Sequence, residues 1–318
     1  MHPWPRLFRS LCAVALFAAA SVHAQTTRLV VPLNPGGATD IYARQLAEEM
    51  TKRGVQTIVE NKPGASGMIA ADYVARSRPD GLTLFLGSNS NLVYNVSLYA
   101  KMPYDPFKDF VPVSHVGHLP VILIARANAP FRNIAEYVAY ARANPGKINR
   151  ASVGAGTITN LGMFMLDRAA GISTTHVPYN GDAAIIQALL SDQVDVYMGS
   201  TTQALPLIQS GKLRPLAVFD RSRLQQLPDV PTLKESGLDV EALAWFGLVA
   251  PAGTPPAIVD RINQVMTQIL SSESFVAKSA QLGWATRTGT PQEFGRFVQG
   301  EFDLWSPLIR DLGMAKSM

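Results

Sequence analysis

The chain has 318 residues and a formal net charge of +4, from 28 lysines and arginines against 24 aspartates and glutamates. This length is ample for a large hydrophobic core in one or two domains, and the charge pattern does not predict nucleic-acid binding. The single cysteine, Cys12, lies near the amino terminus. The rest of the chain therefore excludes disulfides, cysteine nucleophiles and thiolate metal sites.

Residues 1–24 read as a secretory signal peptide, with Arg6 and Arg9 at a positive start, an apolar run, and small residues ending at Ala24. The apolar run is shorter than the roughly 20 residues that span a membrane, and the residues before Cys12 do not match a lipid-attachment signal. We therefore expect cleavage near Ala24 and export of a soluble chain. Without the two signal arginines, the 28 basic residues fall to 26 against 24 acids, a net charge of +2.

After the signal, short runs rich in β-branched residues alternate with amphipathic helical patterns. The predicted strands lie at residues 28–33, 56–61, 82–88, 120–126, 149–155, 175–179, 194–200 and 213–219. Predicted helices lie between strands at 41–50, 133–146 and 182–192, and then almost alone at 256–272, 274–282 and 291–313. This alternation predicts an α/β fold of βαβ units, with mainly parallel sheets flanked by helices.

A glycine turn between a strand and a helix occurs twice, at residues 34–40 and 152–160. We interpret this as two sheets, each with its own ligand-facing helix terminus, and expect the last helices to pack back on the first sheet. Crossings between the domains are predicted near Ile124–Ala127 and Ala244–Gly247. The resulting division is 1–24 signal peptide, 25–125 plus 246–318 domain 1, and 126–245 domain 2.

The two glycine turns are candidate anion-binding sites. The first N–H groups of a helix lack partners and carry partial positive charge, and glycine lets a ligand approach the backbone. The alternative is that these glycines only turn the chain. The first turn offers Gly36, Gly37, Ala38 and Thr39, and the second offers Gly154, Ala155, Gly156, Thr157 and Thr159. No phosphate-binding glycine motif is complete, which favours a carboxylate, or a dicarboxylate held at both ends.

Asp40 stands in the first turn of the helix that would hold the anion. Its expected role is to stabilise the start of this helix, as acidic side chains commonly do at that position. A carboxylate there would also repel a bound anion unless it points sideways along the helix. The sequence leaves both orientations open.

The chain shows no residue set for catalysis. Ser66 lacks the G-x-S-x-G context of a hydrolase nucleophile. His115 and His118, three residues apart in a predicted strand, should point to opposite faces, which argues against a metal pair. His176 is expected to make a structural hydrogen bond. We therefore expect a binding protein with no catalytic residues, metal or cofactor. An exported α/β enzyme is an alternative, and it predicts turnover of a bound carboxylate.

A series of short motifs, in this order, resembles the Bug family, the periplasmic solute-binding receptors of tripartite tricarboxylate transporters. The motifs read PLNPGGATDIYARQLAEEM, VENKPGASG, PDGLTLFLGS, YDPFKDFVPVS, PGKINRASVGAGT, HVPYNG, GKLRPLAVFDRSRLQQLPDVPTLKESG, WFGLVAPAGTP and TPQEFGRFVQGEFDLW. They span essentially the whole chain after the signal. The resemblance implies a two-domain Venus flytrap of the type II periplasmic-binding class, which closes over a small carboxylate with its two glycine turns facing each other.

The resemblance also implies partners and a ligand class. The partners would be the membrane subunits of the transporter, with no nucleic acid, and we expect a monomer in the periplasm. The ligand would be a di- or tricarboxylate or an aromatic acid. The chain departs from the family at Leu33, commonly aromatic, at Asn160, often histidine, and at Asn180, often lysine. Because no acid follows the strand that ends in YMGS, our hypothesis is that the ligand has no ammonium group.

Further ligand contacts are expected at strand ends in both domains. They are Leu33, Asn34 and Asp40 beside the first turn, Ser88 and Asn89 in domain 1, and Tyr179, Asn180 and Thr201 in domain 2. Each is alternatively a cap or turn residue; Asp182 reads as a helix N-cap, and Trp245 and Phe246 are expected in the core. A sensory binding protein that presents its ligand to a membrane receptor kinase fits the same residues, so that alternative stays open.

Overall fold

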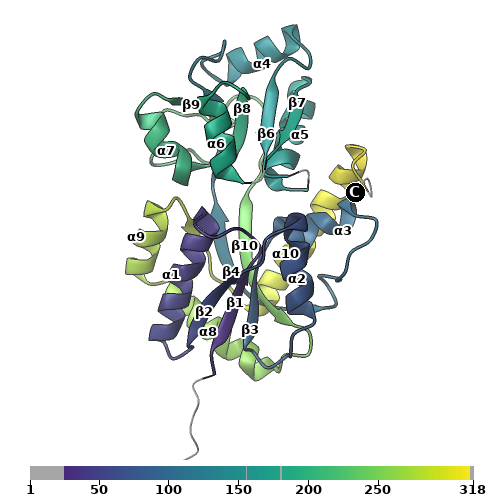
Figure 1. The fold of residues 1–318 in the computed structure, drawn as a ribbon, viewed down its shortest axis with the longest axis vertical. Coiled ribbons are helices and arrows are strands. Elements are labelled where there is room, and N and C mark those ends of the chain that lie inside the picture. The colour runs from purple at the N-terminus through teal and green to yellow at the C-terminus, as the bar shows by residue number, and fades with distance from the viewer. Residues whose placement is uncertain (1–24, 155, 180, 316–318) are drawn as a thin grey trace, which may run out of the picture.

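The computed structural model describes residues 25–154, 156–179 and 181–315, so the predicted signal peptide lies outside the described residues. Figure 1 shows two lobes, one above the other, each with a central sheet covered by helices on both faces. The predicted two-domain α/β architecture is confirmed. Within the described ranges, no helix is both long and apolar enough to cross a membrane.

The first lobe contains a six-stranded sheet in the order β11, β4, β10, β3, β1, β2. Its strands are β1 Thr27–Val31, β2 Thr57–Asn61, β3 Thr83–Ser88, β4 Phe110–Leu119, β10 Ala244–Pro251 and β11 Ala285–Thr286. Its helices are α1 Ala38–Lys52, α2 Met68–Ala75, α3 Asn95–Leu98, α8 Pro256–Leu270, α9 Glu273–Gln281 and α10 Pro291–Asp311, with short helical turns η1 Ala65–Gly67 and η2 Ser90–Tyr94. As predicted, the last helices pack back on this sheet, since α8 and α10 both contact β4.

The second lobe contains a five-stranded sheet in the order β7, β6, β8, β5, β9. Its strands are β5 Val121–Arg126, β6 Asn149–Ser152, β7 Thr175–Pro178, β8 Val196–Ser200 and β9 Leu213–Val218. Its helices are α4 Ile134–Ala143, α5 Ile158–Ala170, α6 Asp182–Leu190 and α7 Thr201–Gln209. Every strand predicted from the hydrophobic runs is present in one of the two sheets.

Each sheet is mixed, which differs from the mainly parallel sheets that we predicted. β1 runs parallel to β2 and β3, and β6 runs parallel to β7 and β8. The strands that carry the chain between the lobes, β4 with β10 and β5 with β9, add antiparallel pairs. β10 and β5 enter their sheets from the other lobe, so these two strands run opposite to the strands of the βαβ units.

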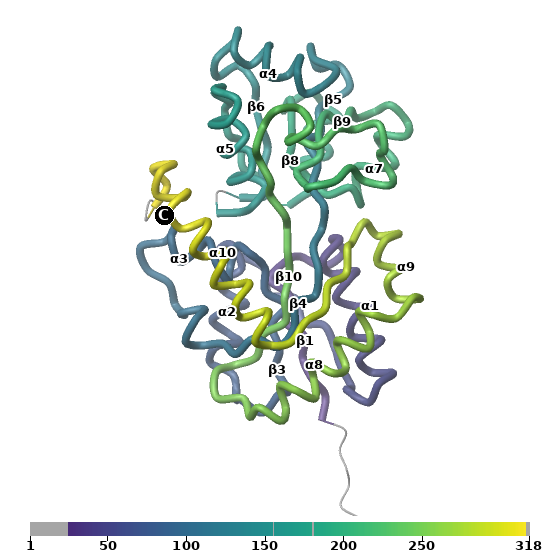
Figure 2. Tube along the Cα trace, turned by 180° about the vertical axis from the view of Figure 1, so that it is seen from behind, coloured from purple at the N-terminus to yellow at the C-terminus, as the bar shows by residue number. Residues whose placement is uncertain are grey.

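The crossings lie side by side in the middle of the molecule (Figure 2). The chain leaves the first sheet after Leu119, passes Pro120, and enters the second sheet at Val121. This change of sheet comes before the predicted crossing near Ile124–Ala127, because the apolar run from Val121 belongs wholly to β5. The return crossing enters the first sheet at Ala244, where a crossing was predicted.

The core of the first lobe follows the predicted apolar face of α1. The side chains on this face are all buried; they are Tyr42, Ala43, Leu46, Ala47 and Met50. The Tyr42 ring stacks on Trp284 at a centroid distance of 3.9 Å. Burying one large apolar side chain contributes about 1.5–3 kcal/mol, so this face fixes α1, and with it the first glycine turn, firmly on the sheet.

Candidate functional site

Strand register places the helix starts of both lobes at the boundary between them. In the second sheet, Val121 pairs with Ser200 at the end of β8, and β6 runs parallel to β8. In the first sheet, Phe246 pairs with Ser88 at the end of β3, which runs parallel to β1. The N-termini of α1, α5, α6 and α7 therefore meet at this boundary (Figure 1). In open α/β sheets this edge is the usual ligand position.

The first glycine turn leaves the start of α1 open. Leu33 is 44% exposed, and Asn34 and Gly36 are also exposed. Gly36 has a φ of +83°, a conformation that favours glycine, and Gly37 holds the N-cap position without a side-chain cap. The first N–H groups of α1 thus point toward the boundary, while Ala38 and Thr39 behind them are buried.

Asp40 is turned away from the N–H groups of α1 and is neutralised. Its carboxylate accepts hydrogen bonds from Arg44 at 2.9 and 3.1 Å, from Asn61 Nδ2 at 2.9 Å and from the Gly36 N–H at 2.9 Å. Burial acts to raise the pKa of Asp40, but these hydrogen bonds outweigh it and hold the pKa below its usual value. The structure thus resolves the orientation that the sequence left open: Asp40 ties the turn together and its charge is paired.

The second glycine turn uses its own hydroxyl groups to hold its shape. Thr157 Oγ1 donates to the Gly154 carbonyl at 2.7 Å and lies 2.8 Å from Thr159 Oγ1, which accepts from the Val153 N–H at 3.2 Å. Both hydroxyl hydrogens are then used inside the turn, so neither is left to donate to a ligand in this arrangement, and the role of these threonines as ligand residues stays a prediction. Thr157 occupies the N-cap position of α5, yet its side chain does not cap the helix.

Gly156 brings the second turn against the first lobe. A Cβ at this position would lie 3.2 Å from Leu98 Cδ1, 3.3 Å from Ser66 Oγ and 3.5 Å from Asn95 Oδ1. These neighbours belong to η1 and α3. The approach is close enough that only a residue without a side chain fits comfortably, so the second turn forms part of the interface between the lobes.

The segment around η1 is a part of the boundary that sequence reasoning missed. Gly64, Ala65, Ser66 and Gly67 all have positive φ, between 48° and 123°. Ala65 and Ser66 are the unusual members, because non-glycine residues rarely adopt this conformation and such backbone strain clusters at functional sites. The Ser66 carbonyl accepts from Asn95, and its hydroxyl lies 3.1 Å from Tyr99 Oη. The sequence signal was the dense PGASG run, which we examined for a nucleophile and counted among the family motifs but did not place at the boundary.

Ser88 and Asn89 are placed at the boundary but are bonded within the protein. Ser88 Oγ accepts from Asn91 Nδ2 at 3.0 Å. Asn89 Nδ2 donates to Tyr94 Oη at 3.0 Å and to the Leu243 carbonyl at 2.7 Å, while its Oδ1 accepts from the Ser90 N–H. Asn89 therefore joins β3 to the return crossing.

The residues that we predicted as ligand contacts or helix caps in the second lobe differ in their burial and in their neighbours. Thr201 is 3% exposed, and a Cβ on Gly283 would meet its Oγ1 at 2.6 Å, so it lies against the first lobe. Tyr179 is partly buried, and its N–H donates to the Ser152 carbonyl beside the second turn. Asp182 is the first residue of α6, with Gly181 at the N-cap, so the predicted N-cap was wrong by one residue. Ala155 and Asn180 lie outside the described residues.

The histidines take structural positions. Burial lowers the pKa of His115 to about 3, and its ring lies 4.5 Å from that of Phe297. His118 Nε2 lies 3.3 Å from Asp220 Oδ2, and His176 Nε2 lies 2.6 Å from Ser152 Oγ, the structural hydrogen bond that we predicted. In the part of the chain that the structure describes, no three His, Cys, Asp or Glu residues are grouped to hold a metal ion.

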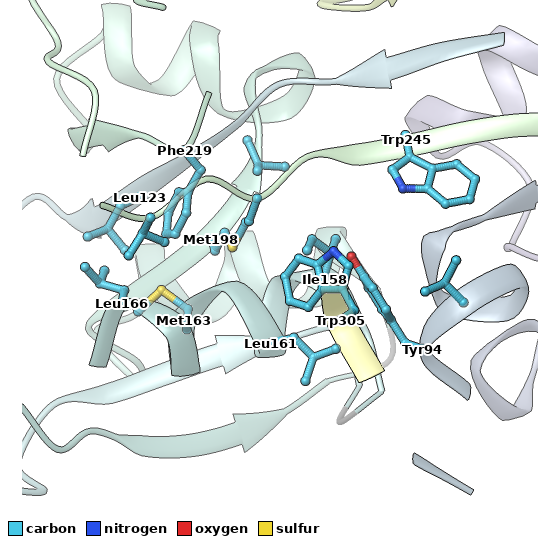
Figure 3. Close-up of a cluster of buried hydrophobic side chains, with 14 of the residues drawn as sticks. Tyr94, Leu123, Ile158, Leu161, Met163, Leu166, Met198, Phe219, Trp245 and Trp305 are labelled. Atoms are coloured by element: carbon cyan, nitrogen blue, oxygen red, sulfur yellow. The ribbon is translucent and has the colours of Figure 1, made fainter. Parts of the chain in front are cut away.

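Apolar side chains of both lobes pack together behind the second turn. Tyr94 and Trp305 of the first lobe lie with ring centroids 4.7 Å apart, in the same buried cluster as Ile158 and Leu161 of α5 (Figure 3). Trp245 is buried as well, and its Nε1 donates to Glu301 at 2.6 Å. The expected core position of Trp245 is confirmed, and α10 holds the two lobes in contact. A hollow of about 310 Å³ lies between residues 96–107 and α10, and no residue of either glycine turn lines it.

Comparison with known proteins identifies the family. The family model described as tripartite tricarboxylate transporter family receptor matches residues 42–314. A Rhodopseudomonas palustris protein solved with adipate is 32% identical, with a TM-score of 0.86 over 91% of this chain and 98% of that one. The periplasmic binding protein BugD is 35% identical, with a TM-score of 0.83 over 91% and 98%. MatC of R. palustris, solved with malate, is 33% identical, with a TM-score of 0.81 over 89% and 98%.

The family match covers most of α1, the second glycine turn and all of the second lobe, and the structural likeness extends over nearly the whole length of the solved relatives. The resemblance to the Bug proteins that the motifs indicated is thereby confirmed. BugD is a periplasmic binding protein, and the matching family model describes a transporter receptor. The chain belongs to the tripartite tricarboxylate transporter receptor family and is a solute-binding receptor, not an enzyme.

Proposed function

We propose that this chain is an exported, periplasmic receptor that holds a small dicarboxylate between its lobes and delivers it to the membrane subunits of a tripartite tricarboxylate transporter. The observation that carries the proposal is that α1 and α5, one from each lobe, begin at the interlobe boundary without a side-chain cap. Uncapped helix starts offer N–H groups and partial positive charge, which suit carboxylates. Two such starts match a ligand with an acid group at each end.

The solved relatives support this ligand class. One was solved with adipate and another with malate, and both molecules carry two carboxylates on a short chain. The ligand residues that we propose for this chain are those of the first turn from Leu33 to Thr39 and those of the second turn from Gly154 to Thr159. The η1 segment from Gly64 to Gly67 is added, because it lies between the two turns: Gly67 approaches Pro32, and Ser66 approaches Gly156.

The acids near the boundary argue against an amino acid as the ligand. Asp40 is paired with Arg44. The Tyr197 hydroxyl donates to Asp182, and burial raises the pKa of Asp182, which favours its neutral form. None of these carboxylates is left to pair with an ammonium group. The hypothesis that the ligand has no ammonium therefore stands as part of the proposal.

The domain division is also proposed, on the strand positions. We place the first lobe at residues 25–120 and 244–318 and the second lobe at 121–243, so that Pro120 and Leu243 mark the crossings. Ligand closure would then rotate the lobes about these crossings, the hinge motion typical of two-lobed binding proteins. The closed form is the one that the membrane subunits would recognise.

Calorimetric titration with succinate, adipate, malate, aspartate and glutamate tests the proposal. We expect micromolar binding of at least one dicarboxylate, about −8 kcal/mol, and weaker binding of the amino acids. Tighter binding of aspartate or glutamate, or no binding of any of the three dicarboxylates, would contradict it. Gly37→Val should abolish binding without unfolding the protein, since φ is −79° and a Cβ there would lie 3.8 Å from its nearest neighbour. Gly300→Ala, in open space on α10, is the control.

A further inference from the structure

Arg150 is a buried cation beneath the second glycine turn. It lies on β6, two residues before Ser152, and is 1% exposed. Its Nη1 donates to Asn160 Oδ1 at 2.6 Å, and its guanidinium lies 4.3 Å from the centre of the Phe164 ring. Both partners are on α5, so Arg150 contacts the helix that starts at the second turn.

The charge of Arg150 is only loosely compensated. An arginine keeps its charge in proteins, even when buried. The nearest acid is Asp167, whose Oδ2 lies 3.7 Å from Arg150 Nε, beyond hydrogen-bond distance. Asp167 Oδ2 accepts instead from Thr174 Oγ1, and burial raises the pKa of Asp167 to about 6. Among the described residues, Arg150 Nε and Asp167 Oδ1 make no hydrogen bond.

A buried charge of this kind is not needed to hold α5 on the sheet. An apolar side chain of similar volume commonly serves a core as well or better, because taking a charge out of water costs several kcal/mol. Leu161 and Leu166, on the same helix, already fasten α5 to the lobe's core. The cost of burying Arg150 therefore points to a role other than stability.

The position of Arg150 connects it to the turn. Asn160, which accepts its shortest hydrogen bond, is the third residue of α5 and donates its own N–H to the Thr157 carbonyl. The field of Arg150 also reaches the other side of the turn: burial first, and the guanidinium second, lower the pKa of His176 to about 4. His176 in turn lies 2.6 Å from Ser152 Oγ, which accepts from the Gly154 N–H.

We propose that Arg150 is the positioning residue that makes the second lobe select a carboxylate: it fixes Asn160 in the first turn of α5 and adds a full positive charge behind the N–H groups there. It acts through the turn and does not touch the ligand. The inference rests on the proposed function. Of the two helix starts that would hold the ligand, it concerns that of α5, and it names Arg150 as the source of the preference for a negative charge there.

Two substitutions that break the same pair separate this role from a structural one. Arg150→Met removes the cation and keeps an apolar side chain of comparable length. Asp167→Asn removes the neighbouring negative charge and leaves the cation less compensated. A purely structural pair predicts that both variants weaken binding alike. The proposed role predicts opposite effects, because only the cation attracts the ligand.

The measurement is calorimetric titration of the full chain with whichever of succinate, adipate and malate binds the unaltered protein most tightly. We expect Arg150→Met to raise Kd about tenfold, and Asp167→Asn to leave Kd unchanged or lower it. A change of less than threefold in Arg150→Met, or a loss in Asp167→Asn as large as in Arg150→Met, would overturn the inference.

A variant that does not fold, and a failure of the proposed function, can each be distinguished from a failure of this inference. If Arg150→Met does not fold, Asp167→Asn decides: weakened binding overturns the role, and binding at least as tight as that of the unaltered protein supports it. If the unaltered protein binds none of the three dicarboxylates, the proposed function fails and this inference falls with it. Binding by the unaltered protein with no effect of Arg150 refutes the inference alone.

Discussion

Replacing Gly156 by alanine tests whether the second turn closes on the first lobe. The added Cβ would lie 3.2 Å from Leu98 Cδ1 and 3.3 Å from Ser66 Oγ, and carbon contacts are optimal near about 3.5–4.0 Å. Both neighbours belong to the first lobe, so the strain arises only when the lobes come together. Overpacking of this kind costs about 1–3 kcal/mol, which corresponds to roughly 5- to 150-fold in Kd.

The assay compares ligand affinity with the stability of the unliganded protein. Because the ligand-free protein is proposed to open at its crossings, we expect Gly156→Ala to raise Kd for the bound dicarboxylate in calorimetry while leaving the melting temperature of the ligand-free protein nearly unchanged. Gly300→Ala is the matched control: its Cβ meets nothing within 4 Å, so Kd should not move and the helix should gain up to about 1 kcal/mol. A Kd for Gly156→Ala within twofold of the unaltered protein would refute the reasoning.

Three further predictions concern stability and pH. Asp40→Asn should lower stability by about 1.5–3 kcal/mol in chemical denaturation, because it removes the charged acceptor of Arg44; an unchanged midpoint would contradict this. Gly247→Ala should cost about 3 kcal/mol or more, since its Cβ would lie 1.9 Å from Phe294 Cζ, and a variant as stable as the parent would contradict the packing. Burial lowers the pKa of His115 to about 3, so stability present above pH 6.5 is lost as pH falls toward 3. His115→Phe should flatten that loss in denaturation midpoints, and an equally steep loss would count against it.

The elements that the sequence predicted correctly share a clear periodicity. α1 could be placed because its apolar residues recur every three or four positions, and β5 because five apolar residues run between Pro120 and Arg126. β10 was not predicted as a strand. Its residues Trp245 to Ala250 are all buried, so no alternation of polar and apolar residues marks it.

The errors have physical causes as well. The first crossing was expected within β5 because nothing in the apolar run shows which sheet the run joins. Pro120 was the better signal for the crossing, because proline cannot donate a hydrogen bond to a neighbouring strand. The η1 turn was missed because Ala65 and Ser66 adopt positive φ without being glycine: the PGASG run indicates a turn, but not this conformation at its alanine and serine. Arg150 was missed because arginines are mostly exposed, and only its neighbours in the fold show that it is buried.

The most direct test of the central claim is a crystal structure of the chain with a dicarboxylate from the titrations bound. The account predicts one carboxylate within hydrogen-bond distance of backbone N–H groups between Gly36 and Thr39, and the other within that distance of N–H groups between Gly154 and Thr159. A ligand that lies clear of either stretch, or that is held through a metal ion or a covalent bond, would contradict the account.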